Sequence, residues 1–197
     1  MTEHYYKEHQ TSELRLNKIK TILRNREFEF YTGSGVFGIR KIDKGSELLI
    51  NKCIIKDSWN VLDLGCGYGP VGITIKTIFP DTDITMTDIN KRAIKLTKMN
   101  MKLNKVTAKI KRGDLYEKLK EQKFDTILVN PPFKAGRKLC LQIIEDSKQH
   151  LKDKGLLQLV AVHNKGGKML RKKMLEVFGN VKDLAKKSGY RIYVSEL

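Results

Sequence analysis

The stretch Val61-Leu62-Asp63-Leu64-Gly65-Cys66-Gly67-Tyr68-Gly69 decides the fold of this chain. An apolar run that ends in an acid and then alternates glycines indicates a buried strand that turns sharply toward a ligand. A second stretch, Asn130-Pro131-Pro132-Phe133, follows another buried-strand pattern at Phe124–Val129. Both motifs should lie at the carboxyl edge of one parallel sheet, where open α/β sheets bind ligands. We therefore expect one crevice and a reaction centre between the two motifs.

Around these motifs, strand and helix patterns alternate from residue 58 onward, which predicts an α/β fold with a mostly parallel sheet and helices on both faces. Strands are expected at 60–64, 83–87, 107–111, 124–129 and 156–162, and helices at 71–78, 91–103, 136–151 and 166–178. The pieces 181–185 and 191–194 flank the turn Lys187-Ser188-Gly189, so the last strand should run antiparallel to its neighbour.

At 197 residues, the chain suits one domain, with residues 58–197 as the core and 1–57 as an N-terminal elaboration packed on it. Within that elaboration, we expect an amphipathic helix over 12–23, extended pieces at 28–30 and 36–39, and a helix from residue 46. The composition is that of a soluble protein, and no apolar run of about 18 residues or signal-peptide core is present. These features predict a cytoplasmic protein without membrane contact.

Cysteine and histidine patterns predict no metal site. Cys53, Cys66 and Cys140 lack metal-ligand spacing, and four scattered histidines form no cluster, so three reduced structural thiols are expected.

The charge is strongly one-sided. The chain carries a formal net charge of +17, residues 1–90 hold 12 basic and 12 acidic residues, and residues 91–197 hold 27 and 10. Such an excess favours a polyanionic partner over a merely solvated basic surface.

Three acids follow three successive strands of the predicted sheet. Asp63 could bind an ammonium group, Asp88 both hydroxyls of a ribose, and Asp114 an adenine amino group. Each acid by itself could equally cap a turn or a helix, so the argument comes from their common spacing. The glycines also match G-x-G-x-x-G at residues 67–72, but Pro70 at the first helical position disfavours a dinucleotide site.

Asn130-Pro131-Pro132-Phe133 is the more specific motif. The prolines would fix the Asn130 side-chain oxygen and the Pro131 carbonyl as acceptors, and Phe133 could stack on a planar base. Such a site suits an exocyclic amino group, whose hydrogens it would accept while the nitrogen attacks an electrophile.

Together, the residues from Asp63 to Gly69, Asp88, Gly113-Asp114 and Asn130 to Phe133 resemble class I S-adenosylmethionine-dependent methyltransferases. The segment Phe30-x-Thr32-x-x-Gly35-Val36-Phe37, followed by Asp43-x-Gly45, looks like the entry segment of the small-domain (MTS) members. These include ribosomal RNA guanine-N2 methyltransferases and their stand-alone archaeal relatives. The resemblance implies a Rossmann-like, seven-stranded sheet with an antiparallel last strand.

The resemblance also implies S-adenosyl-L-methionine as cofactor and a guanine of ribosomal or transfer RNA as acceptor, at the exocyclic N2. Bacterial RNA members usually place histidine after the tetrapeptide, where this chain has Lys134, and they carry a second domain. The implied cofactor-binding residues are Asp63, Gly65, Gly67, Gly69, Asp88, Ile89, Asp114, Leu115 and Asn130. The implied catalytic residues are Asn130, Pro131, Pro132 and Phe133.

Other acceptors remain open at this point. Guanine N7, a protein glutamine or DNA could be methylated instead, or the chain could be an inactive RNA-binding module, as a monomer or homodimer. Lysines 91, 95, 98 and 102 form one stripe of a helix, which is usually a solvated face. Better candidates for RNA phosphate contacts are Lys134, Arg137, Lys138, Lys165, Lys168 and Arg171.

Overall fold

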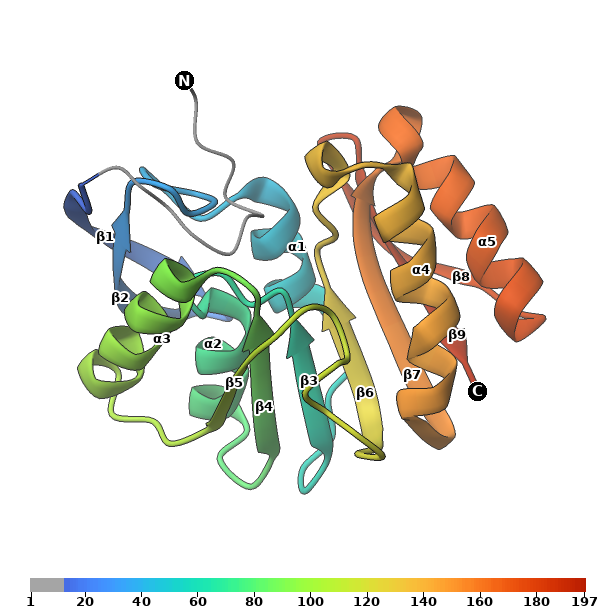
Figure 1. Cartoon of the computed structure of the whole chain (residues 1–197), viewed down its shortest axis with the longest axis horizontal. Coiled ribbons are helices and arrows are strands. Elements are labelled where there is room, and N and C mark those ends of the chain that lie inside the picture. The colour runs from blue at the N-terminus through green and yellow to red at the C-terminus, as the bar shows by residue number, and fades with distance from the viewer. Residues whose placement is uncertain (1–12) are drawn as a thin grey trace.

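A twisted seven-stranded sheet forms the centre of the protein (Figure 1), whose structure, a computed structural model, describes residues 13–197. Its strand order is β5-β4-β3-β6-β7-β9-β8. The strands are β3 (Asn60–Leu64), β4 (Asp83–Asp88), β5 (Lys109–Arg112), β6 (Phe124–Val129), β7 (Leu151–Val162), β8 (Lys182–Lys187) and β9 (Tyr190–Glu196). Because β3, the first strand, lies in the middle beside β4 and β6, the chain reverses direction across the sheet there and opens a crevice at the carboxyl edge.

Within residues 13–197, five α-helices cover the sheet. They are α1 (Lys44–Lys52), α2 (Pro70–Ile78), α3 (Lys91–Leu103), α4 (Arg137–Ser147) and α5 (Lys168–Phe178). Helices α1 to α3 pack on one face and α4 with α5 on the other, and each face has its own apolar cluster. Successive residues of a strand point to opposite faces, so Val61 belongs to the first cluster and Leu62 to the second. The expected fold class, with helices on both faces, is confirmed.

Strand β9 runs antiparallel to both of its neighbours, β7 and β8, whereas β3 to β7 are mutually parallel. The turn between β8 and β9 contains Ser188 and Gly189, both with positive φ (50° and 82°). The predicted antiparallel hairpin at the end of the sheet is therefore confirmed.

The predicted helix over 12–23 is wrong, because Leu16–Leu23 is strand β1, paired with β2 (Arg26–Gly33) in a separate antiparallel hairpin. Residue 12 lies outside the described residues. Arg24 and Asn25 form the turn, with φ of 46° and 61°, the left-handed geometry of a two-residue hairpin loop. Inward burial at alternate positions (Ile19, Thr21, Leu23) shows a strand period of two.

Other boundaries differ less. Residues 36–39 form bends instead of the expected extended piece. Helix α1 begins two residues before the predicted start, because Asp43 caps it by accepting a hydrogen bond from the Ser46 N–H (2.8 Å). Strand β7 begins at Leu151, where the predicted fourth core helix was to end, after a 3-10 turn at Lys148–His150.

The N-terminal hairpin is fixed to the core by Asn100 of α3, which is fully buried. Its side-chain oxygen accepts from the Tyr31 N–H (2.6 Å), and its Nδ2 donates to the carbonyls of Tyr31 and Tyr68 (both 2.8 Å). One side chain thus joins β2, α3 and the glycine-rich loop after β3. Among the described residues, no helix has the length and apolarity needed to cross a membrane.

Candidate active site

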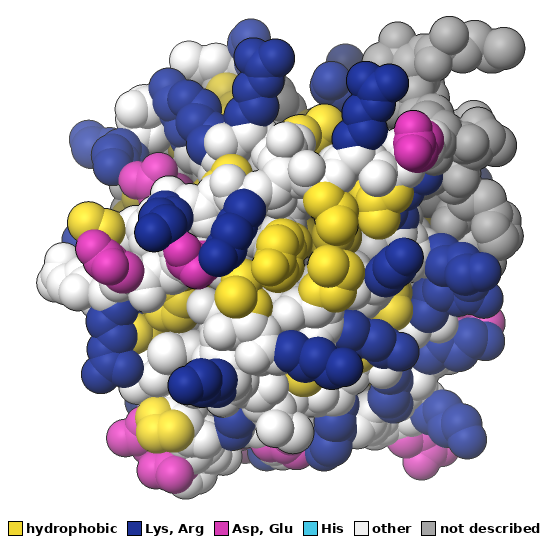
Figure 2. All heavy atoms as spheres, turned by 90° about the vertical axis from the view of Figure 1, so that its left-hand side faces the viewer, with side chains coloured by type: hydrophobic (Ala, Val, Ile, Leu, Met, Phe, Trp, Pro, Cys, Tyr) yellow, Lys and Arg dark blue, Asp and Glu magenta, His cyan; other side chains and the backbone are white. Residues whose placement is uncertain are grey.

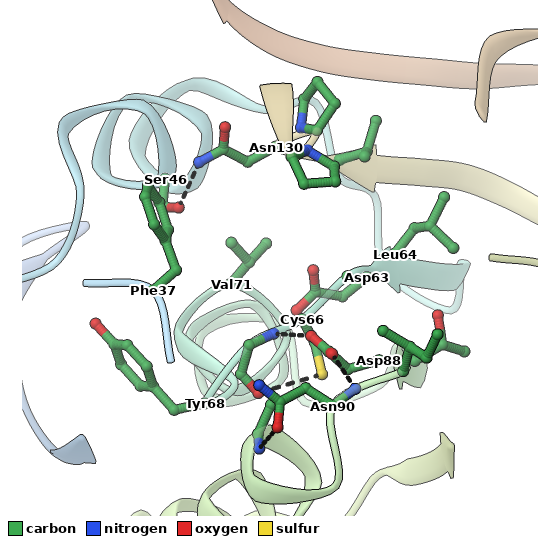
Figure 3. A pocket seen from close by; sticks show the side chains of 18 of the residues that line it. Phe37, Ser46, Asp63, Leu64, Cys66, Tyr68, Val71, Asp88, Asn90 and Asn130 are labelled. Carbon is green, nitrogen blue, oxygen red and sulfur yellow. Dashed lines mark hydrogen bonds between the residues drawn. The ribbon is translucent and has the colours of Figure 1, made fainter. Parts of the chain in front are cut away.

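A cavity of about 1170 Å³, its open mouth included, lies at the carboxyl ends of β3, β4 and β6 (Figure 3). Most of the predicted site residues line it: Asp63, Gly65, Gly67, Asp88, Ile89, Asp114, Leu115, Asn130, Pro131 and Pro132. Asn130 lies on one side, and Asp88 and Asn90 lie on the other. The glycine loop and the double-proline corner therefore do face one pocket, as the sequence predicted.

The loop after β3 leaves room for a ligand. Gly65 and Gly67 have φ of 72° and 59°, a left-handed conformation that disfavours other residues. A Cβ on either would have no heavy atom within 4 Å, so the backbone borders open space there. Gly69, also predicted to bind the cofactor, does not line the cavity; it caps α2, and a Cβ would lie 2.8 Å from the Ile73 side chain.

Asp63 is a buried carboxyl on the cavity wall, 3% exposed. Its Oδ2 accepts a hydrogen bond from the Gly72 N–H (2.9 Å), at the start of α2. Burial raises the pKa of Asp63 to about 7, the Gly72 bond opposes that rise, and the charge of Asp88 adds to it. A carboxylate held in such surroundings favours a cationic ligand, because the cation compensates for the lost hydration of the charge.

Asp88 ends β4 and holds two loops together. Its Oδ2 accepts from the Gly67 N–H and its Oδ1 from the Asn90 N–H, both at 2.8 Å. Burial raises the pKa of this carboxyl to about 6, while the bonds from Asn90 and Gly67 lower it. Each carboxylate oxygen can accept a further hydrogen bond, so these contacts leave acceptor capacity for ligand hydroxyls.

Asn90 supports this arrangement from the start of α3. Its Oδ1 accepts from the N–H groups of Arg92 (2.8 Å) and Ala93 (3.3 Å), which caps the helix, and its Nδ2 donates to the Gly35 carbonyl (2.9 Å). The cavity wall contributed by residues 36–38 is thereby tied to the end of β4.

Asn130 directly follows β6, and residues 43–46 of the N-terminal elaboration hold its side-chain amide. Its Nδ2 donates to Asp43 Oδ2 (2.7 Å) and to Ser46 Oγ (3.0 Å) of helix α1. The side-chain oxygen lies on the other side of the amide from Ser46, as Figure 3 shows, and Asn130 is one of the residues that line the cavity. The Pro131 carbonyl already accepts one hydrogen bond, from the Phe133 N–H (2.9 Å), which gives that corner its tight turn.

The two aromatic residues near this corner differ from expectation. Phe133 does not line the cavity; its ring lies against Gly166, where a Cβ would approach to 2.5 Å. Phe37, which the sequence argument left without a role, lines the cavity with 40% of its surface exposed. Figure 3 shows its side chain extending toward Ser46 and Asn130. The only signal for Phe37 was its place in the entry segment.

Basic residues gather at the same edge of the sheet. Lys134, Arg137, Lys138, Lys165 and Lys168 are all exposed, and none forms an ion pair within residues 13–197. Arg171, predicted with them, is instead paired with Asp183 (2.8 Å). Within that same part of the chain, no group of three His, Cys, Asp or Glu side chains is placed to hold a metal.

A second basic surface lies on α3, beside the hairpin. Figure 2 shows this side of the molecule, where apolar side chains are surrounded by lysines and arginines. A shallow groove there is lined by Leu14, Lys91, Arg92, Ile94, Lys95, Lys98, Met99 and Lys102. The predicted lysine stripe is therefore one wall of a hollow surface, to which residues 13–197 contribute no acidic lining residue.

Comparison with known proteins identifies the family. Residues 27–194 match the family described as methyltransferase small domain, which is most of the chain. This chain belongs to the methyltransferase small domain family. The membership confirms the expectation of a methyltransferase that uses S-adenosyl-L-methionine.

Within this family, YbxB, an uncharacterized protein of Bacillus subtilis, is 38% identical over 195 residues, which are 98% of this chain and 97% of that protein. Ribosomal RNA small subunit methyltransferase C of Haemophilus influenzae (strain PittEE) is 37% identical over 135 residues. That match covers 66% of this chain but only 41% of the relative, so the chain spans less than half the length of that protein.

Solved structures of methyltransferases share the fold. The T. thermophilus 16S rRNA N2 G1207 methyltransferase (RsmC), in complex with AdoMet and guanosine, superposes with a TM-score of 0.79 at 22% identity. The superposition covers 94% of this chain and 51% of the T. thermophilus chain. A methyltransferase from Pyrococcus furiosus superposes with a TM-score of 0.66 at 18% identity, over 73% of this chain and 77% of that one. At such identities, the likeness concerns the fold alone.

Proposed function

We propose that this methyltransferase transfers a methyl group to the exocyclic N2 of a guanine in structured RNA, ribosomal or transfer RNA. One observation carries the proposal: Asp63 and Asp88, the buried acids at the ends of β3 and β4, line the same cavity as Asn130. The net charge of +17 and the RNA methyltransferases among the relatives support an RNA acceptor.

The cofactor residues have complementary chemistry. Asp63 would bind the ammonium of S-adenosyl-L-methionine, because its carboxylate is buried and has no cationic partner within residues 13–197. Asp88 would accept the ribose hydroxyls, and Asp114 with Leu115 and Ile89 would contact the adenine. Gly65 and Gly67 would lie along the methionine part. The bound cofactor supplies an electrophilic methyl group on a sulfonium.

The acceptor base would enter from the side of Asn130 and Pro132. The Asn130 oxygen would accept a hydrogen from the guanine amine, which localises its lone pair and aligns it with the methyl group. Phe37 would take the stacking role predicted for Phe133, because its ring borders the cavity. Such stacking typically contributes about 1–3 kcal/mol per base.

Incubation with labelled cofactor tests the proposal directly. Purified protein would be mixed with radiolabelled S-adenosyl-L-methionine and separate fractions of ribosomal RNA, transfer RNA and ribosomal protein, and the labelled product digested to nucleosides. We expect label in N2-methylguanosine. Label in 7-methylguanosine would show that guanine N7 is the acceptor, and label in methylglutamine would show that a protein glutamine is. RNA binding without any transfer would favour an inactive RNA-binding module.

Two basic surfaces compete for the RNA phosphates. Alanine at Lys134, Arg137 and Lys138 should reduce RNA affinity, and the salt dependence should fall by about one counterion for each phosphate that is no longer bound. The matched variant has alanine at Lys95, Lys98 and Lys102 in the α3 groove, which removes the same number of positive charges as the first variant. If only the second variant changes the salt slope, the RNA lies along α3 and the assignment of the first surface is refuted.

A further inference from the structure

Asp43 and Asn130 lie 87 positions apart in the sequence and meet at the cavity. Asp43 Oδ2 accepts hydrogen bonds from Asn130 Nδ2 (2.7 Å) and from the Ser46 N–H (2.8 Å). Ser46 Oγ accepts the second hydrogen of the same Asn130 amide nitrogen (3.0 Å). Both donors of the Asn130 side chain are therefore used by the N-terminal end of α1.

This contact fixes the orientation of the amide. A carboxylate only accepts hydrogen bonds, whereas a primary amide has two donors on nitrogen and acceptor sites on oxygen. A rotated Asn130 would place its oxygen against the Asp43 carboxylate, where two acceptors repel. The nitrogen must therefore face Asp43, and the oxygen lies on the other side of the amide, away from the carboxylate.

We infer that Asp43 is a positioning residue for methyl transfer, which it serves by holding the Asn130 oxygen toward the acceptor amine. The inference rests on the proposed function and deepens it. In the transfer, the amine nitrogen forms the new C–N bond as the C–S bond breaks, the electron pair of that bond stays on sulfur, and the amine proton leaves to water. The nitrogen becomes more positive as it reacts, so a correctly aimed acceptor favours the transition state.

The charge of Asp43 adds to its geometric role. A carboxylate hydrogen-bonded to the NH₂ end of an amide polarises it and makes the amide oxygen a stronger acceptor. The other carboxylate oxygen, Oδ1, faces the Tyr190 hydroxyl at 3.4 Å, a long hydrogen bond. Since Oδ2 is already bonded to two protein donors, Asp43 serves Asn130 and is not the group that takes the substrate proton.

Helix capping alone does not account for this arrangement. Asp, Ser, Thr and Asn are all effective N-caps, and the cap requires only the bond from the Ser46 N–H. The bond to Asn130 joins a different element, at the end of β6, and contributes nothing to the cap. A role restricted to capping therefore predicts that Ser serves as well as Asp at this position.

Four variants separate the two roles. Asp43→Ser keeps a capping oxygen but is too short to reach Asn130, and Asp43→Asn keeps an acceptor at the same reach without the charge. Asn130→Ala and the double variant Asp43→Ser/Asn130→Ala complete a cycle. Glu47→Gln is the control, because it removes a neighbouring acid of α1 that pairs with Lys187 (3.3 Å) and does not contact Asn130.

Turnover, RNA KM, cofactor Kd and Tm would be measured for each variant. We expect Asp43→Ser to lose at least about tenfold in kcat with Kd and Tm near wild type, since a misaimed acceptor acts only in the transition state. Asp43→Asn should lose less, and the double variant should match Asn130→Ala. Additive losses in the cycle, or an unchanged kcat for Asp43→Ser, would overturn the inference. If Asp43→Ser does not fold, Asp43→Thr replaces it, and the same outcomes decide.

A second readout needs no RNA. The Asn130 side-chain ¹⁵N amide resonance, assigned by its loss in Asn130→Ala, should shift in Asp43→Ser but not in Glu47→Gln. An amide signal that is insensitive to Asp43 refutes the positioning contact. If the signal shifts but wild type methylates no RNA, the proposed function fails while the orientation of Asn130 by Asp43 stands.

Discussion

Acidic pH should weaken cofactor binding, because the two buried carboxyls must be ionised to hold it. Their pKa values are raised by burial to about 7 for Asp63 and about 6 for Asp88. Between pH 7.0 and 5.5, the ionised fraction of a group with pKa 7 falls about 16-fold, and that of a group with pKa 6 about fourfold. If both must be charged, the affinity for S-adenosyl-L-methionine falls about 60-fold over this range.

Isothermal titration calorimetry in buffers of different ionisation enthalpy measures both the affinity and the protons released on binding. 5′-Methylthioadenosine, which has ribose and adenine but no ammonium, is the matched ligand. Between pH 7.0 and 5.5, the affinity for 5′-methylthioadenosine should fall only by the factor that the protonation of Asp88 contributes, about fourfold. An affinity for S-adenosyl-L-methionine that stays within about twofold between pH 5.5 and 7.0 would refute the reasoning, and so would equal pH dependence of the two ligands.

The burial of Asp63 also makes the stability of the folded protein depend on pH. Because the folded-state pKa of Asp63 lies above its ordinary value, the stability that this group contributes is full at acidic pH and is lost as pH rises through about 7. Asp63→Asn should therefore stabilise the ligand-free protein at pH 7.5, by at least about 1 kcal/mol, while it weakens cofactor binding. The reasoning would be contradicted if Asp63→Asn were less stable than wild type and its stability changed with pH as that of wild type does.

Three further substitutions probe the cavity. Asp88→Ala should weaken cofactor binding by at least about tenfold with the fold retained, since charged hydrogen bonds are lost; unchanged calorimetric affinity would contradict the ribose role. Gly72→Ala places a Cβ 2.6 Å from the buried Met86 sulfur and should lower the free energy of unfolding by about 1–2 kcal/mol, so an unaltered denaturation midpoint would show that Met86 moves away. Phe37→Ala should raise the RNA KM about tenfold and leave the cofactor Kd unchanged, as loss of base stacking would; a normal KM would exclude Phe37 from base binding.

Much of the core could be predicted from sequence because each signal is local. The helix over 91–103 matches α3 residue for residue, since Asn90 caps it and its apolar positions keep a helical period. The strand at 60–64 was equally clear, because its apolar run ends at the glycine loop.

The N-terminal hairpin was mispredicted because its signals are ambiguous. The apolar residues of 14–23 fit a helical as well as a strand period, and the turn consists of Arg24 and Asn25 without the glycine that usually marks a hairpin. Only the pairing of β1 with β2 decides between the two. The sequence carries no local sign of that pairing.

The site was predictable where it follows a strand end and not where it depends on distant contacts. Asp63, Asp88 and Asn130 each end or nearly end a strand, so their place at one edge follows from the parallel topology. The Asp43 contact with Asn130 joins segments 87 residues apart, and the Arg171 pair with Asp183 joins helix α5 to strand β8. No local spacing indicates either contact.

The position of β9 between β7 and β8 constrains how the protein is made. Among the described strands, β8 is hydrogen-bonded only to β9, so until residues 190–196 emerge from the ribosome, β8 has no partner and β7 presents an open edge. Tyr190 also packs against Gly45 at the start of α1, on the side that holds Asn130. Until β9 has been synthesised, the nascent chain therefore lacks the Tyr190 contact at the start of α1, and the unpaired edge of β7 is open to pairing with other chains.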